Sequence, residues 1–169
     1  MSLPKSDLPV ASSKELEWTQ EASPSGTVAF QRKKLGAAAG SEKLGCSLME
    51  LAPGKRSWPP HAHFANEEAL YILKGQGKVR IGKKEVPVTA GDYIALLPGQ
   101  ENAHQTINDS GEPLVYLCFS TMLEPDITLY PDSWKVGLFA GAAPGGPEEK
   151  QTLKRFLRLN EELDYWEDE

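Results

Sequence analysis

Short β-rich runs recur along the sequence, separated by segments rich in glycine, proline, asparagine and aspartate. The runs lie at residues 27–35, 43–51, 68–75, 78–82, 92–98, 104–108 and 113–120. Many short strands at a spacing of about 8–12 residues are typical of an antiparallel sandwich or barrel. Within residues 78–82, the apolar Val79 and Ile81 alternate with basic residues, which indicates one buried and one solvated face. The pattern predicts an all-β fold and places Arg80 on the solvated face.

The length of 169 residues allows one sizeable core and is too short for two ordinary domains. Residues 1–25 show no sustained period and predict a loosely ordered N-terminal arm, whereas residues 26–160 are expected to form the β domain. Residues 153–159 (LKRFLRL) are expected to be extended and to cover or pair a sheet edge, with a short amphipathic helix as the alternative. The final segment, 161–169, is an acidic tail.

The charge distribution argues against nucleic acid and membrane partners. The chain has 18 Lys and Arg residues against 24 Asp and Glu residues, but six of these acidic residues lie in the tail. The rest of the chain is therefore balanced and lacks the basic field that binding to nucleic acid or an anionic membrane requires. The longest apolar runs span about six residues, far below the roughly 20 of a transmembrane helix. The N-terminus shows no secretory signal pattern, so we expect a cytoplasmic protein.

The two cysteines, Cys46 and Cys118, lie far apart in the sequence and both stand in apolar runs. This number and placement suit buried thiols better than a disulfide framework or a zinc–thiolate site. The sequence therefore predicts two free cysteines.

All three histidines of the chain stand in or beside predicted strands. His61 and His63 occupy positions i and i+2, which on an extended strand places both imidazoles on one face, about 7 Å apart. The adjacent acidic residues Glu67 and Glu68 and the more distant His104 could complete a transition-metal pocket. The alternative is a polar, hydrogen-bonded face that binds no metal.

The spacing around these residues resembles the first motif of the cupin superfamily, which is a glycine, His-x-His, a glutamate and a second glycine. The matching residues are Gly54, His61, His63, Glu68 and Gly75, with one extra residue before the first histidine. The gap of six residues to Gly75 counts from Glu68. The match to this motif therefore selects Glu68 over its neighbour.

A later segment resembles the second cupin motif, in which a glycine and a proline precede a histidine and an asparagine. Here Gly91, Pro98, His104 and Asn108 follow in that order, and the spacing from histidine to asparagine is that of the motif. The gaps on either side of Pro98 are each one residue longer than in the motif. Together the two motifs cover about residues 43–120.

The resemblance implies a single cupin barrel, an antiparallel double-stranded β-helix of the jelly-roll type, with an N-terminal arm and a C-terminal extension. It also implies one divalent transition metal ion, with His61, His63, Glu68 and His104 as ligands. Strand alternation places Glu68 on the inward face, and Glu67 then points outward. The ligand set does not distinguish Fe, Mn, Ni, Zn and Cu.

Cupin barrels support many reactions, so the resemblance leaves the function open. We expect an enzyme that acts on a small polar or anionic metabolite chelated by the metal, of the isomerase, dioxygenase or decarboxylase type. The alternatives are a non-catalytic ligand-binding or sensing cupin and, more weakly, a sugar-phosphate isomerase-like protein. The resemblance also suggests a homodimer, in which residues 27–35 add a strand to a second copy. Arg56 and Trp58, just before the histidines, are candidate ligand contacts that more often serve as surface and packing residues.

Overall fold

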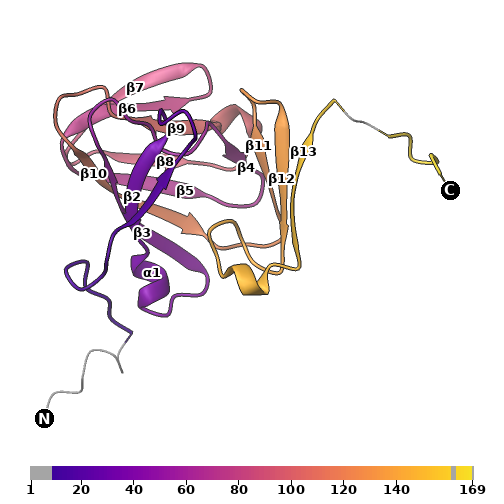
Figure 1. Cartoon of the computed structure of the whole chain (residues 1–169), viewed down its shortest axis with the longest axis horizontal. Helices are drawn as coiled ribbons and strands as arrows, with labels where there is room; N and C mark the ends of the chain where they lie inside the picture. Colours follow the sequence, from indigo (N-terminus) through magenta and orange to yellow (C-terminus); the bar gives the residue numbers. More distant parts are fainter. Residues whose placement is uncertain (1–8, 161–162, 169) are drawn as a thin grey trace, which may run out of the picture.

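The computed structural model describes residues 9–160 and 163–168 and consists almost entirely of antiparallel β-sheet (Figure 1). The all-β prediction is therefore confirmed. The strands are β1 (Thr19–Ala22), β2 (Ala29–Lys33), β3 (Leu44–Leu51), β4 (Ala62–His63), β5 (Glu68–Lys74), β6 (Gln76–Ile81), β7 (Lys84–Thr89), β8 (Tyr93–Leu96), β9 (His104–Ile107), β10 (Leu114–Thr121), β11 (Asp126–Tyr130), β12 (Lys135–Ala140) and β13 (Leu153–Arg158). The helical elements are α1 (Leu35–Ala38) and the 3-10 turns η2 (Gln100–Asn102) and η3 (Glu148–Lys150).

The largest sheet has the strand order β1-β2-β3-β10-β5-β8 and carries most of the core. On β5, Leu70 and Ile72 are 3% and 0% exposed, whereas the alternate residues Tyr71 and Leu73 are 39% and 44% exposed. This alternation places the side chain of Glu68 on the same inward face as the core residues. The core cluster consists of Phe30, Met49, Leu51, Leu70, Ile72, Val79, Val88, Leu96, Leu114 and Tyr116.

Two smaller sheets complete the jelly roll. One has the order β7-β6-β9, and the other has the order β13-β12-β11-β4. In Figure 1, β11, β12 and β13 stand together on the opposite side of the molecule from β2 and β3. The two-residue strand β4 pairs with β11, with Thr128 opposite His63. The first histidine motif is thus held by strands that come much later in the chain.

The second glycine of the first motif, Gly75, occupies a turn that has no room for a side chain. Gly75 joins β5 to β6 with a φ of +85°, a conformation that favours glycine. A Cβ atom at this position would lie 2.5 Å from the carbonyl oxygen of Pro113, so the position has no room for a side chain. The tight turn starts β6 in the correct register to pair with β9, the strand of His104.

Some sequence predictions require correction. The arm predicted to be loosely ordered contains β1, which pairs with β2, although its first eight residues lie outside the described part. In the run at 27–35, the strand ends at Lys33, and helix α1 begins at Leu35. Strands β7, β11 and β12 were not expected, because Pro87 interrupts the first and turn residues flank the other two. The prediction that residues 153–159 are extended is confirmed by β13. The acidic tail lies partly outside the described residues.

Strand β2 pairs with β1 and β3 of the same chain, so it is already used on both edges. The addition of this strand to a second copy is therefore not the arrangement seen here. The homodimer itself stays a prediction, which light scattering tests against the monomer mass of 18.5 kDa. Within the described residues, helices are too short to cross a bilayer.

Candidate metal centre

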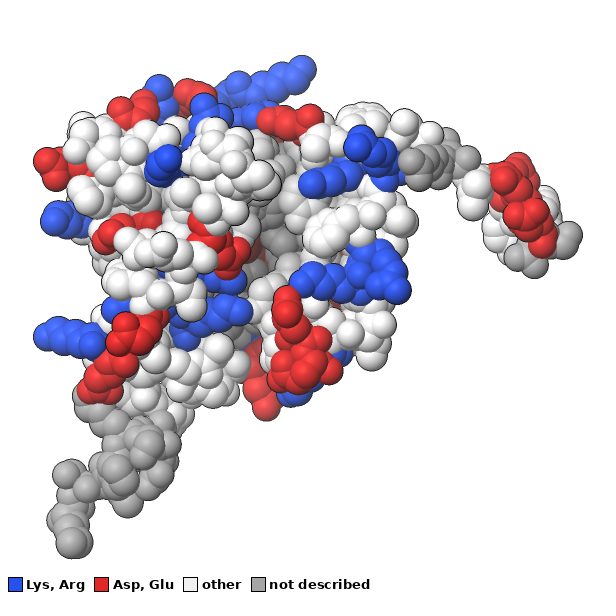
Figure 2. Space-filling model, in the orientation of Figure 1, with Lys and Arg blue, Asp and Glu red and all other residues white. Residues whose placement is uncertain are grey.

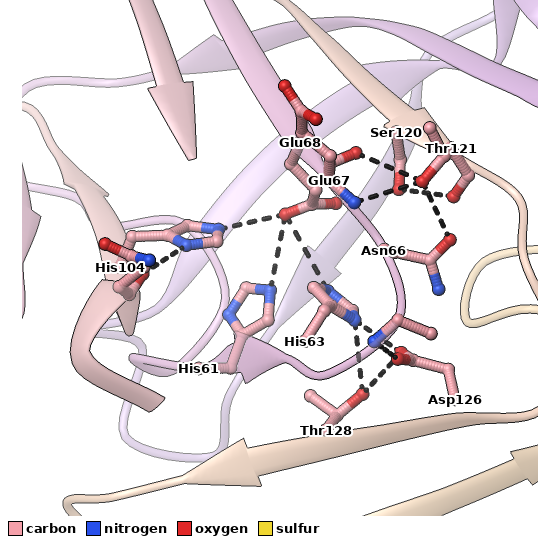
Figure 3. A network of polar contacts seen from close by, with 12 residues as sticks. His61, His63, Asn66, Glu67, Glu68, His104, Ser120, Thr121, Asp126 and Thr128 are labelled. Atoms are coloured by element: carbon pink, nitrogen blue, oxygen red, sulfur yellow. Dashed lines mark hydrogen bonds and ion pairs between the residues drawn. The ribbon is translucent and has the colours of Figure 1, made fainter. Parts of the chain in front are cut away.

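Four side chains from three parts of the fold converge inside the barrel (Figure 3). His61 immediately precedes β4, His63 ends β4, Glu68 begins β5 and His104 begins β9. The Oε2 atom of Glu68 lies 2.9 Å from Nε2 of His104, 3.7 Å from Nε2 of His63 and 3.8 Å from Nε2 of His61. All four residues expected from the cupin motifs are thus brought together, whereas Glu67 is exposed.

Backbone pairing fixes the relative positions of His61 and His104. The two residues form an isolated antiparallel bridge, with His61 N 3.2 Å from His104 O and His104 N 2.8 Å from His61 O. The loop between β8 and β9, including η2, folds back so that Gly99 N donates to the carbonyl of His63 at 2.9 Å. This loop contains the longer gaps relative to the second motif, and it still places His104 beside the first histidine pair.

Each histidine is oriented through its Nδ1 atom, which leaves Nε2 free to face Glu68. Nδ1 of His61 donates to the carbonyl of Pro59 at 2.9 Å, and that of His104 donates to the carbonyl of Asn102 at 3.0 Å. Nδ1 of His63 donates to the buried Asp126 carboxylate at 2.6 Å. Such outer contacts fix the tautomer and ring orientation of metal-binding histidines.

The spacing of the donor atoms fits a transition ion. Two ligands at right angles on an ion, each about 2.1 Å from it, are about 3 Å apart. The Glu68–His104 spacing already has this value, and the other two histidines need to approach by less than about 1 Å. The ligand atoms of His61, Glu68 and His104 lie within 4.8 Å of one another, so these three residues could hold an ion. Imidazole and carboxylate donors are a set that suits first-row transition metals.

The protonation states of His61 and Glu68 suit metal binding. Burial, reinforced by the neighbouring His104, lowers the pKa of His61 to about 3, so its imidazole is neutral near pH 7. Burial alone would raise the pKa of Glu68, but the hydrogen bond from His104 and the nearby imidazoles outweigh it and lower the pKa to about 2. A neutral imidazole and an ionised carboxylate are the forms that bind a metal ion.

Asp126 is a functional candidate that the sequence reasoning missed. Its side chain is buried, and its carboxylate also accepts hydrogen bonds from Ala65 N at 2.9 Å and from Thr128 Oγ1 at 3.3 Å. Although burial opposes charge on His63, the hydrogen bond to Asp126 and the charge of Glu68 outweigh it, so the pKa of His63 is raised. The available signal in the sequence was the alternation of Asp126, Thr128 and Tyr130, which places these three side chains on one face of a strand.

The loop that connects the histidines to Glu68 is fixed by a buried amide. Asn66 Oδ1 accepts hydrogen bonds from Leu123 N at 2.7 Å and Thr121 Oγ1 at 3.2 Å, and Nδ2 donates to Leu123 O at 3.1 Å. Figure 3 shows the contact between Asn66 and Thr121 beside Glu68. It aligns the start of β5 with the end of β10 and thereby sets the direction of Glu68.

The other singled-out residues have structural contacts. Asn108 of the second motif is fully buried and donates to the carbonyls of Leu51 and Glu112, so it organises a turn.

Trp58 packs on Phe30 with ring centroids 4.3 Å apart. Arg80 is not a merely solvated residue, because its guanidinium holds both carboxylate oxygens of Asp132 at 2.6 and 2.8 Å.

The two cysteines are free, as predicted. They belong to neighbouring strands of the large sheet but to opposite faces, because Cys46 lies opposite Phe119 and Cys118 lies opposite Ser47. Side chains on opposite faces of a sheet cannot form a disulfide without moving the backbone.

Residues 47–120 match the family model of the cupin domain. An uncharacterized protein of Methanocaldococcus jannaschii is 35% identical over 60 residues, which are 36% of this chain and 46% of that protein, so the match spans less than half of the relative.

Solved structures with the same architecture cover more of the chain. A proposed sugar phosphate isomerase from Acidithiobacillus ferrooxidans has a TM-score of 0.77 at 23% identity and covers 94% of this chain and 97% of its own. A sugar phosphate isomerase of the cupin superfamily from Silicibacter pomeroyi has a TM-score of 0.73 at 21% identity and covers 91% and 95%. A predicted oxalate decarboxylase from Thermotoga maritima has a TM-score of 0.59 at 26% identity and covers 68% and 99%.

The jelly-roll fold and the histidine–glutamate cluster define a β-barrel whose interior side chains could hold a metal ion. With the family match of residues 47–120, they identify this part of the chain as a cupin domain.

Proposed function

We propose that the chain binds one divalent transition metal ion through His61, His63, Glu68 and His104 and uses it to bind a small chelating anion. The observation that carries this proposal is the convergence of three Nε2 atoms on one oxygen of Glu68, while every Nδ1 atom is held by a hydrogen bond. A merely polar face would not require all three rings to be oriented in the same way.

The charge of the site selects the ligand class. Three neutral imidazoles and one carboxylate leave a divalent ion with a formal charge of +1, inside a barrel lined by apolar residues such as Leu70 and Ile72. Four protein donors on a six-coordinate ion also leave two positions for oxygen atoms of a ligand. A bidentate anion such as a 2-oxo acid, a hydroxy acid or a dicarboxylate meets both conditions.

The proposed activity is metal-dependent catalysis on such an anion, of the decarboxylase, dioxygenase or isomerase type. When bound, the ion would supply Lewis acidity or oxygen activation at the chelated atoms. Hydrogen bonds within the chain orient the donor rings, and Asp126 holds His63 in this way. The apolar side chains of the barrel wall exclude water. The predicted oxalate decarboxylase that resembles this chain is named for a chelating dicarboxylate, which supports this ligand class.

A non-catalytic cupin that senses such an anion would have the same site. The two functions differ in turnover, because a sensor returns the ligand unchanged. Sugar-phosphate isomerisation remains a further candidate within the proposed class, because two solved structures with this fold carry that name.

The experiment begins with metal analysis of protein purified without a histidine tag or chelator. Calorimetry then compares oxalate, 2-oxoglutarate and glucose as ligands of the metal-loaded protein, the metal-free protein and the His104→Ala variant. We expect the anions to bind only the metal-loaded wild type. Equal affinity for the metal-free form, or a preference for glucose, would contradict the proposal. Product analysis after incubation, with and without Fe(II) loading, separates an enzyme from a sensor.

A further inference from the structure

A series of neighbouring aromatic rings extends from the candidate metal centre along the inner face of the sheet β13-β12-β11-β4. The ring of Tyr130 is nearly parallel to that of His61, with the centroids 6.1 Å apart and an interplanar angle of 28°. Phe156 of β13 follows, with its centroid 6.1 Å from that of Tyr130. The register places Tyr130 opposite Lys135 and places Gly137 opposite Phe156, so these side chains share the face that holds Asp126 and Thr128. This face continues outward from the proposed ligand site.

Two cations lie directly opposite each other at the end of this series of rings. Lys135 of β12 pairs with Arg158 of β13 in the ladder, and Lys135 Nζ lies 5.1 Å from the centroid of Tyr130. Like charges that face each other across neighbouring strands are destabilising. The arrangement therefore needs a compensating anion or a functional reason.

The described part of the chain provides no carboxylate for either cation. Among residues 9–160 and 163–168, the ion pairs do not include Lys135 or Arg158. The nearest acidic residue in the β11–β12 turn, Asp132, is held by both guanidinium nitrogens of Arg80. Figure 2 shows Lys and Arg side chains gathered over the part of the molecule where Figure 1 places β12 and β13.

A cavity of about 280 Å³ lies at this pair of cations. It is lined by Ser133, Lys135, Phe156, Leu157 and Arg158, so it combines two cations, a hydroxyl and an apolar wall. Its volume is several times the roughly 30 Å³ of a water molecule, which leaves room for a phosphate or carboxylate group. We call it the Lys135–Arg158 pocket.

We propose that the Lys135–Arg158 pocket binds a second anionic group of the ligand whose other end chelates the metal. This inference rests on the proposed function and adds a substrate class, namely a small hydroxy or oxo acid with a terminal phosphate or carboxylate. The cation–ring and ring–ring spacings of 5.1 and 6.1 Å put Lys135 Nζ within about 11 Å of the His61 ring. The carboxylate and the phosphate at the two ends of a six-carbon sugar acid are separated by a distance of this order. An arginine fork and a lysine ammonium are the donors that commonly hold such oxyanions.

The test uses a matched pair of ligands, gluconate and 6-phosphogluconate. Both carry the same 2-hydroxy carboxylate for the metal, and only the second carries a phosphate at the far end of the carbon chain. Calorimetry of the metal-loaded protein at low ionic strength should show that 6-phosphogluconate binds about tenfold more tightly, the factor of a single charge-assisted contact at a partly exposed site. The Lys135→Gln/Arg158→Gln variant should lose most of this advantage and keep its affinity for gluconate.

Arg155→Gln is the matched control, because Arg155 lies on the same strand but pairs with Leu138 on the opposite face. This variant should retain the full preference for the phosphorylated ligand. An equal loss in the control, or a preference that survives in the double variant, would overturn the inference. Gluconate that binds without any gain from the phosphate would overturn the pocket alone. Phosphate-dependent binding that is equal with and without metal would support the pocket and contradict the proposed function.

Discussion

The Nδ1 atom of His63 and the Oδ2 atom of Asp126 are 2.6 Å apart in the buried interior, although 63 positions separate the two residues in the chain. The contact depends on the pairing of β4 with β11, which places Thr128 directly opposite His63. The later third of the chain thus determines the orientation of a residue in the first histidine motif. A carboxylate in this position raises the basicity of the imidazole and holds its Nε2 atom toward the centre.

We expect Asp126→Asn to weaken metal binding by about 10- to 100-fold, the range typical for loss of an outer contact to a metal-bound histidine. The amide keeps the size of the side chain and removes its charge, so we expect the metal affinity to fall while the fold is retained. Competition with a chelator of known affinity measures the change. Asp109→Asn, which removes an exposed surface carboxylate paired with Lys78, should leave metal affinity unchanged. Equal affinity in both variants would show that Asp126 does not support the site.

Most strands and the inward position of Glu68 could be predicted from local signals, whereas the barrel and the set of four central residues were implied by the resemblance to the two cupin motifs. Short β-rich runs between turn residues identified β2, β3, β5, β6, β8, β9 and β10. The i, i+2 spacing of His61 and His63 placed both rings on one face, and parity within β5 separated the inward Glu68 from the exposed Glu67. Each of these inferences needs only the few residues around it.

The missed features depend on contacts between distant parts of the chain. The Asp126 carboxylate has no nearby motif, and its role appears only when β11 pairs with β4. Arg80 looked like a solvated residue because its partner Asp132 lies 52 positions away. The cationic pair of Lys135 and Arg158 likewise requires the register of β12 and β13, which turn residues between the two strands obscured.

The barrel interior should be sensitive at alternate positions of a single strand. Ile72 is fully buried, and Ile72→Ala removes methylene groups and leaves a cavity, so we expect a loss of about 2–5 kcal/mol in the free energy of unfolding. Leu73→Ala at the neighbouring, 44% exposed position should cost less than about 1 kcal/mol. Denaturant unfolding of both variants measures the difference. Similar losses would mean that the register of β5 is wrong.

The thiols should react slowly in the folded protein. Burial raises the pKa of Cys46, and burial together with the charge of Glu68 raises the pKa of Cys118 well above its usual value. A higher pKa leaves less thiolate at a given pH, and the thiolate is the reactive form. At pH 8, iodoacetamide should therefore modify both cysteines at least about tenfold more slowly in the native protein than in guanidinium, with Cys118 the slower. Peptide mass spectrometry follows each site, and native rates equal to unfolded rates would refute the expectation.

Glu68 and Glu67 offer the sharpest test of the metal centre, because two adjacent carboxylates point in opposite directions. Glu68 lies within 3.8 Å of all three Nε2 atoms, whereas Glu67 is exposed and its backbone N–H donates to Thr121. We expect Glu68→Gln to reduce retained metal to a small fraction, because it replaces the only anionic donor of the set with a neutral amide. Glu67→Gln should retain the wild-type amount, since it removes the same charge from the surface. Elemental analysis after dialysis measures both, with circular dichroism as the check on folding. Equal metal loss in two folded variants would show that a general charge effect, and not coordination by Glu68, holds the ion.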